Sequence, residues 1–230
     1  MIKTEFNQTT IAKSASLIGV GLHTGKNVTL TFKPAEENNG YTFKRIDLEG
    51  TPIIKADANF VTNTQRGTCL EKNGVTIQTC EHVLAALVGL QIDNVCIELD
   101  ASEPPIMDGS SKFFVEACET AGIVELAAKR EEYIVREVIT YRDEDTGSEI
   151  TVIPSSEYQV TTMVDFGTKV LGTQNATLDT LSDFKIEISD SRTFSFLHEI
   201  EMLLEHGLIK GGDLNNAIVY VDKELSENTM

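Results

Sequence analysis

Apolar and polar residues alternate in several short runs of the first half of the chain, as they do in strands with one buried face. The clearest run, residues 28–32, ends at Pro34, and residues 11–33 are predicted to form two strands around a glycine-rich turn. Residues 72–74, Lys-Asn-Gly, form a turn sequence typical of a β-hairpin. Further strands are predicted at residues 41–45, 67–70, 75–78 and 94–99.

A helical period follows the hairpin, because apolar residues recur at helical spacing from residue 83 to residue 87. Thr79 is a suitable N-cap, since its hydroxyl can accept a hydrogen bond from a free backbone N–H, and Gly89 is a typical helix stop. A second helix is predicted after the Pro-Pro turn, with a cap at residues 110–111 and an end at Gly122.

The second half of the chain follows a charged segment, residues 125–132, which we interpret as a connector. We therefore predict an N-terminal α+β domain at 1–127 and a second α+β domain at 133–230 that is incomplete at its C-terminus. The two are faintly alike, because each contains a Thr-Gly turn, an alternating strand and a proline. In the second domain, strands are predicted at 133–141, 149–153, 158–166, 192–196 and 216–221, and helices at 181–188 and 198–206.

The charge of the chain argues against two kinds of partner. Thirty-six acidic and 19 basic residues give a formal net charge of −17, so neither nucleic acid nor an anionic membrane surface is expected to be the main partner. No apolar run suggests stable insertion into a membrane, and residues 1–6 do not begin a signal peptide. The 4 cysteines lack Cys-x-x-Cys spacing and are expected to be reduced thiols. We expect a cytoplasmic protein.

The dipeptide Glu81-His82 falls in the first turn of the predicted helix. The positive end of the helix dipole favours an ionised carboxylate and a neutral imidazole there. A neutral imidazole can ligate a metal, and a carboxylate can take a proton from a metal-bound water. The simpler interpretation is a surface carboxylate that favours the dipole beside a half-buried histidine. Taken alone, the dipeptide favours this simpler interpretation.

The glycine-rich turn places Gly19, Gly21 and Gly25 around His23. The spacing is one residue longer than the dinucleotide fingerprint, and both flanks are predicted strands rather than a strand and a helix. A tight hairpin that needs positive φ therefore explains the glycines better than a phosphate site does. His23 would project from this turn into space that a ligand can occupy.

Several motifs occur together in an order that resembles one enzyme family. They are GVGLHTG at 19–25, Glu81-His82 with GLQIDN at 89–94, PIMDGS at 105–110, SRTFSF at 191–196 and GGDLNNAIV at 211–219. The combination resembles the zinc-dependent UDP-3-O-acyl-N-acetylglucosamine deacetylases of lipid A synthesis, over nearly the whole chain. The resemblance implies two related layered sheet-plus-helix domains, an active site between them, a bound Zn²⁺ and a small-molecule nucleotide-sugar lipid substrate.

The resemblance also implies roles for individual residues. His82 would be a zinc ligand, and Glu81 would take a proton from the zinc-bound water. Thr193 would donate a hydrogen bond to the developing oxyanion. His23 would line the site and contact substrate, whereas Asp108 is expected to be only a turn and cap residue.

Further residues would contact the substrate if the resemblance holds. Phe194 would lie against the sugar ring, Asp165 and Phe166 would meet the uracil, and Ile200 and Leu203 would line a passage for the acyl chain. Simple strand alternation also explains Phe194, with Thr193 outside. An apolar stripe that includes Ile200 and Leu203 is equally typical of plain core.

Part of the expected metal site is missing from this sequence. In the resembling family a His-x-x-x-Asp helix completes the zinc site and a later histidine is the general acid, but neither His198 nor His206 begins such a motif. The chain resembles the front portion of the enzyme. We therefore predict that it binds zinc weakly or not at all and shows no meaningful turnover. Two alternatives stay open: a non-catalytic chain of the same fold that binds a nucleotide-sugar or a partner, and a fusion with another lipid-pathway domain.

Overall fold

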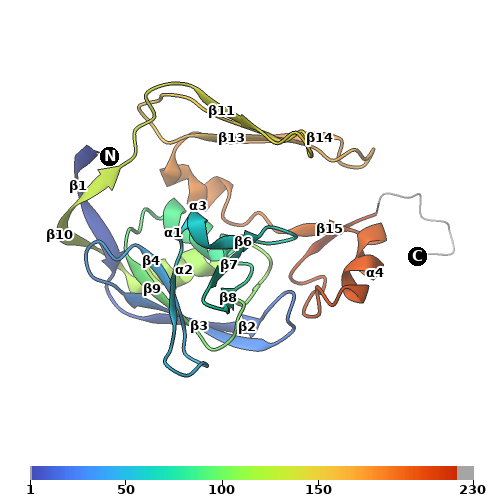
Figure 1. The fold of residues 1–230 in the computed structure, drawn as a ribbon, viewed down its shortest axis with the longest axis horizontal. Helices are drawn as coiled ribbons and strands as arrows, with labels where there is room; N and C mark the ends of the chain where they lie inside the picture. The colour runs from blue at the N-terminus through green and yellow to red at the C-terminus, as the bar shows by residue number, and fades with distance from the viewer. Residues whose placement is uncertain (1, 222–230) are drawn as a thin grey trace.

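The computed structural model describes residues 2–221 and is centred on a five-stranded sheet (Figure 1). The strand order is β2-β3-β9-β4-β5, and all neighbours are antiparallel except β4 and β9, which are parallel. The bounds are β2 Ala15–Val20, β3 Asn27–Pro34, β4 Tyr41–Arg45, β5 Ile53–Lys55 and β9 Val95–Leu99. The predicted strand pair around the glycine-rich turn and the strands at 41–45 and 94–99 are thus confirmed.

Two helices, α1 (Glu81–Gly89) and α2 (Lys112–Ala121), share one hydrophobic core with this sheet. The alternating side chains of β3 supply Val28, Leu30 and Phe32 to that core. Phe32 meets Phe114 of α2 edge to face, with ring centroids 6.4 Å apart. The period-2 pattern read from the sequence therefore identified the buried face correctly.

The ends of α1 differ from the prediction. Thr79 does not cap the helix with its side chain; the N-cap is Cys80, and the Thr79 hydroxyl instead donates to Glu103. Gly89 is the last helical residue rather than a left-handed stop, and a Cβ placed on it would lie 2.1 Å from the Phe184 ring. The glycine is required for close packing, which local sequence does not reveal.

A small sheet beside α1 contains β6 (Val61–Asn63), β7 (Cys69–Lys72) and β8 (Val75–Ile77), after a short 3-10 helix, η1 (Ala58–Phe60). The turn between β7 and β8 has Asn73 at φ 54° and Gly74 at φ 77°. Two successive positive φ angles are what the predicted Asn-Gly hairpin turn requires.

The charged segment at 125–132 is not a connector. It belongs to β10 (Ile123–Glu132), which pairs antiparallel with β1 (Ile2–Ile11). A boundary at residue 127 would cut this strand. The prediction failed because a half-exposed strand in a two-stranded ribbon can have the same charged composition as a linker. Only its pairing with a distant segment, β1, makes it a strand. The division into two domains stays a prediction.

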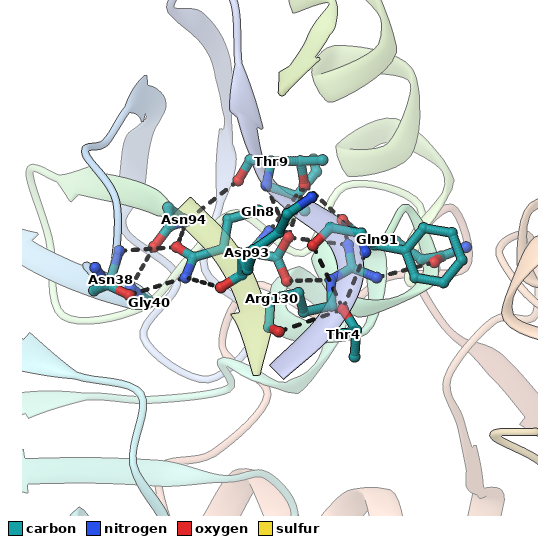
Figure 2. A network of polar contacts seen from close by, with 12 residues as sticks. Thr4, Gln8, Thr9, Asn38, Gly40, Gln91, Asp93, Asn94 and Arg130 are labelled. Atoms are coloured by element: carbon teal, nitrogen blue, oxygen red, sulfur yellow. Dashed lines mark hydrogen bonds and ion pairs between the residues drawn. The ribbon is translucent and has the colours of Figure 1, made fainter. Parts of the chain in front are cut away.

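A polar network ties the β1–β10 ribbon to the central sheet (Figure 2). Asp93, just before β9, accepts a hydrogen bond from the Thr9 backbone N–H at 2.8 Å and from Arg130 Nη2 at 2.9 Å. The neighbouring Asn94 donates to Gln8 Oε1 at 2.9 Å. The network thus joins β1, β10 and the start of β9 at one point.

Two hairpins form the next part of the chain and lie along the upper edge of the view in Figure 1. They are β11 (Ile139–Arg142) with β12 (Glu149–Val152), and β13 (Val160–Asp165) with β14 (Thr173–Leu178). The first predicted strand of this half begins later than expected, and β14 was missed because its sequence is mostly polar. Apolar side chains such as Tyr141 and Met163 are exposed on these hairpins.

The last part of the described chain is a β-α-β unit. After η2 (Leu181–Asp183) and α3 (Phe184–Glu187), β15 (Phe194–Phe196) leads into α4 (Leu197–Glu205) and then β16 (Ile218–Tyr220), which pairs parallel with β15. The predicted strand-helix-strand order is confirmed, and so is the α+β class. No helix within residues 2–221 is long and apolar enough to cross a membrane.

We predict that Gly89→Ala destabilises the protein by about 1–3 kcal/mol, because the new methyl group would overlap the Phe184 ring. Without that overlap, alanine would instead stabilise the helix by about 1 kcal/mol. Urea unfolding measures whether the substitution lowers or raises the free energy of unfolding. Val88→Ala, on the exposed side of the same helix, is the control and should change stability by no more than about 0.5 kcal/mol. A more stable Gly89→Ala protein would contradict the packing argument.

Candidate active site

The glycine-rich turn is held by a fully buried carboxylate, Glu103. Its oxygens accept hydrogen bonds from the backbone N–H groups of His23 at 2.9 Å and Thr24 at 2.8 Å. They also accept one from the Thr79 hydroxyl at 2.9 Å. A Cβ on Gly21 would lie 2.6 Å from Glu103 Oε2. Gly21 is therefore needed to make room for the carboxylate.

Sequence analysis missed Glu103. Its donors lie 80 and 24 residues away in the chain, so no local pattern marks them. The only signal is a charged residue placed directly before Pro104-Pro105. In the structure this carboxylate joins the turn that contains His23 to Thr79. Thr79 precedes α1 and has a φ of 51°. A β-branched residue at positive φ is strained, and such strain persists only where the surroundings hold it.

Both ring nitrogens of His23 are engaged by the backbone. Nδ1 accepts from the Ile209 N–H at 3.3 Å, so the ring proton resides on Nε2, which donates to the Arg66 carbonyl at 3.1 Å. His23 thus links the loop before β7 to the segment after α4. In this arrangement the imidazole has no free nitrogen for a metal.

His23 lines a cavity. The cavity has a volume of about 100 Å³. Its walls come from the glycine-rich turn, the small sheet with its loops, and the segment after α4: His23, Asn63, Gln65, Gly67, Cys69, Gln78, Thr79 and Leu208. The cavity adjoins Glu81, because the position of a Cβ on Gly67 lies 3.4 Å from Glu81 Oε1.

Glu81 and His82 lie in the first turn of α1 and are both half-buried. Glu81 Oε2 accepts from the Thr68 N–H at 2.9 Å. Burial lowers the pKa of His82 below its ordinary value, while the charges of Glu81 and Asp108 act in the opposite direction. The imidazole is therefore neutral at neutral pH, and burial is the main cause.

Residues 108–111 connect His82 to the β-α-β unit. The Ser111 hydroxyl donates to the His82 carbonyl at 2.9 Å, and the Gly109 carbonyl accepts from the Thr193 N–H at 2.7 Å. Gly109 has φ 87°, and a Cβ on it would lie 2.1 Å from the Asn216 carbonyl oxygen. His82 and Thr193 are therefore attached to one short segment, which requires glycine at its centre.

Asp108 has the predicted turn role, because its Oδ1 accepts from the backbone N–H of Ser110 at 3.0 Å. Its backbone carbonyl also accepts from Arg192 Nε at 2.6 Å, a contact that the sequence did not reveal. Thr193 follows Arg192 on the way into β15. Among residues 2–221 no hydrogen bond to the Thr193 hydroxyl is found, so this donor is available to a ligand.

Phe166 and Phe194 belong to an aromatic cluster. Their rings meet edge to face with centroids 5.3 Å apart, and Phe194 has a similar contact with Tyr220 at 5.4 Å. Asp165 is exposed, and its Oδ1 accepts from the Gly167 N–H at 3.0 Å. The structure thus brings Phe166 and Phe194 together, whereas the contacts of Asp165 are those of a turn residue.

Helix α4 presents its apolar residues unevenly. Leu203 is buried, Ile200 is half-buried and Leu204 is exposed. Leu203 therefore contributes to packing within the β-α-β unit, and Ile200 retains some accessible surface. The burial of Leu203 and Ile200 therefore fits both an apolar stripe that packs into the core and the wall of a passage for an acyl chain.

Residues 2–221 contain no group of three His, Cys, Asp or Glu side chains arranged to hold a metal. A catalytic zinc normally has three protein ligands, and His82 is the one that the sequence predicted. Weak zinc binding by this chain stays a prediction. We predict that calorimetric titration of the 230-residue chain with Zn²⁺ shows no tight 1:1 site, and a clear sub-micromolar site would refute this.

These features define a mixed α+β protein with a carboxylate–imidazole pair at the start of a helix, held between a glycine-rich turn and a β-α-β unit. A family model described as LpxC: UDP-3-O-acyl N-acetylglycosamine deacetylase matches residues 8–230. The chain belongs to this family, which confirms the resemblance found in the sequence.

Curated relatives agree with that assignment. The chain is 47% identical over 222 residues, 96% of its length, to the "Bifunctional enzyme LpxC/FabZ" of Bacteroides thetaiotaomicron, covering 48% of that protein. It is 44% identical over 223 residues to the protein of the same name from Porphyromonas gingivalis, covering 97% of this chain and 48% of that protein. It is 42% identical over 220 residues to the "UDP-3-O-acyl-N-acetylglucosamine deacetylase" of Myxococcus xanthus, covering 95% of this chain and 69% of that protein. The chain spans about half the length of the first two relatives.

We predict that Glu103→Gln destabilises the protein by about 3 kcal/mol, because the amide N–H₂ would face donors that need an acceptor. Thr79→Val removes one donor and should cost about 1 kcal/mol. Glu98→Gln is the matched control: its carboxylate bonds the partly exposed Lys33 and Lys44, and the change should cost less than about 1 kcal/mol. Equal urea-unfolding midpoints for Glu103→Gln and Glu98→Gln would contradict the role given to Glu103.

Proposed function

We propose that the protein to which this chain belongs is a cytoplasmic, zinc-dependent hydrolase. It removes the N-acetyl group from a UDP-3-O-acyl-N-acetylglucosamine in lipid A synthesis. The observation that supports this most directly is the attachment of His82 and Thr193 to one segment, residues 108–111. That attachment fixes a possible metal ligand and an available hydroxyl donor relative to each other. Family membership and the name of the Myxococcus relative support the substrate.

The reaction requires water to add to the acetamide carbonyl and the C–N bond then to break, which gives acetate and a free amine. In this proposal Glu81 is the general base that takes the proton from the attacking water. One of its oxygens is held by the Thr68 N–H, which fixes the orientation of the carboxylate. The carbonyl oxygen becomes an oxyanion during the addition, and the Thr193 hydroxyl donates to it.

Zinc is part of the proposal, but the described residues do not supply a complete site for it. His82 offers a neutral imidazole, which is the form that binds metal. The remaining ligands would have to come from outside residues 2–221, since no suitable group of three occurs within them. We therefore assign His82 as one ligand.

The proposed substrate contacts extend from the pair in α1 toward the second half of the chain. Phe194 would meet the sugar and Phe166 the uracil, and their mutual ring contact would place these two parts of the ligand side by side. Asp165, Ile200 and Leu203 keep the roles that the resemblance implied. His23 would contact the substrate as part of the wall of the cavity that it lines, because both of its ring nitrogens are already hydrogen-bonded to the backbone.

A second candidate is a bifunctional protein in which this deacetylase part is joined to another enzyme. The relatives at 47% and 44% identity have names that state two functions, and the chain covers 48% of each. The sequence of the gene beyond codon 230 tests this directly. A His-x-x-x-Asp motif followed by a further domain would support it, whereas a reading frame that ended without that motif would favour the non-catalytic alternative.

We predict that Glu81→Gln, made in the full-length enzyme, lowers kcat by about 10²–10⁴-fold while zinc content stays near the wild-type value. Glutamine keeps the shape of the side chain but cannot accept the proton. His82→Ala should lose zinc together with activity, because it removes a ligand. Turnover measurements and metal analysis on the same preparations separate the two roles.

Gln78→Glu provides a control, because it adds a carboxylate at a cavity-lining position three residues from Glu81. It should not restore turnover when combined with Glu81→Gln. If Glu81→Gln retained near-normal turnover, Glu81 would be only a charge that favours the helix terminus. That result would remove the base from the proposed mechanism.

A further inference from the structure

One ion pair connects two segments that are far apart in the sequence, a loop that lines the cavity and helix α4. Arg66, in the loop between β6 and β7, meets Glu199, in the first turn of α4. The contact is bidentate, with Nη2–Oε1 at 2.5 Å and Nη1–Oε2 at 3.3 Å. The Arg66 side chain is 42% exposed and that of Glu199 is 19% exposed. Solvent and salt can therefore reach the pair.

Each partner is fixed by further contacts. Arg66 has φ 59°, in the left-handed region, and its carbonyl accepts from His23 Nε2 at 3.1 Å. Glu199 Oε2 also accepts from the Phe196 N–H at 3.2 Å and thereby caps α4. The Arg66 guanidinium holds the pKa of Glu199 below its usual range. The pair is consequently charged at neutral pH and joins the loop to the β-α-β unit.

The loop held by this pair forms part of the cavity wall. Asn63, Gln65 and Gly67 come from the loop side, and Leu208 comes from the segment that follows α4. With the pair formed, the cavity measures about 100 Å³. Small-molecule sites usually measure about 300–1,000 Å³, so the cavity with the pair formed holds only part of an organic ligand of ordinary size. The ion pair holds this loop to α4, whereas the bonds from His23 Nε2 to the Arg66 carbonyl and from the Thr68 N–H to Glu81 hold it to the glycine-rich turn and to α1.

We propose that the Arg66–Glu199 pair is a latch that holds the loop at residues 63–67 against α4, and that its opening gives ligands access to the cavity beside Glu81. Because solvent reaches the pair, salt weakens it, while its bidentate geometry makes it strong enough to hold the loop measurably. The inference does not rest on the proposed reaction. The latch controls access whatever the cavity binds.

Cys69 provides a direct readout, because its half-buried side chain lines the cavity and is adjacent to the loop. The alkylation rate of each cysteine by N-ethylmaleimide is measured by mass spectrometry on the folded protein at low salt. Glu199→Gln and Arg66→Gln should each raise the rate at Cys69 by about two- to fivefold, the range that an exposed pair supports. Raising the salt concentration should produce the same increase in wild type and little further increase in the variants.

Cys96 is the internal control, since it is also half-buried but lies on β9 in the central sheet. Its rate should not change. Lys185→Gln, which breaks a different exposed ion pair with Glu119, is the matched control variant and should leave Cys69 unaffected. The double variant Arg66→Gln/Glu199→Gln should show no greater rate than either single variant, because all three remove the same contact.

Three outcomes would overturn the latch. Equal Cys69 rates in wild type and both single variants would show that the pair does not control access. A parallel increase at Cys69 and Cys96 would show general loosening instead of a local opening. A double variant whose increase at Cys69 combined the two single increases in full would assign the effect to the individual side chains. No substrate is used, so these outcomes are independent of the deacetylase proposal.

Discussion

The carboxylate of Glu103 is buried and takes its hydrogen bonds from two separate parts of the chain, the glycine-rich turn and the residue that precedes α1 by two positions. A buried charge is costly unless it is fully hydrogen-bonded, so both parts must stay in place together. This requirement fixes His23 and the start of the helix that contains Glu81 and His82. It also excludes any side chain at Gly21. The geometry of the candidate site depends on this one buried group.

A second constraint joins the site to the other half of the chain. Residues 108–111 bond to the His82 carbonyl on one side and to the Thr193 N–H on the other. The backbone approach at Gly109 is so close that only glycine fits. Residues on α1 and just before β15 are thereby held by main-chain contacts, which vary less than contacts between long side chains. The Arg66–Glu199 pair differs, because it joins two long side chains that solvent reaches.

Several elements could be predicted because local pattern and tertiary packing agree. The alternation in β3 marks the face that supplies Val28, Leu30 and Phe32 to the core, and the Asn-Gly turn specifies the β7–β8 hairpin. The prediction failed at β10, where a charged strand is defined only by its pairing with β1. It failed also at Thr79, because the sequence does not show whether a threonine hydroxyl caps a helix or donates to a distant carboxylate.

The sequence by itself determined the α+β class, the position of the Glu81-His82 helix and, through its motifs, the family. These depend on periodicity and on short turn sequences, which act over a few residues. Only the tertiary structure decided that Glu103 anchors the glycine-rich turn, that His23 is engaged on both ring nitrogens, and that His82 and Thr193 share one segment. Those contacts join residues that are tens to nearly two hundred positions apart. No local pattern records such a contact, because its energy depends on partners brought together only by the complete fold.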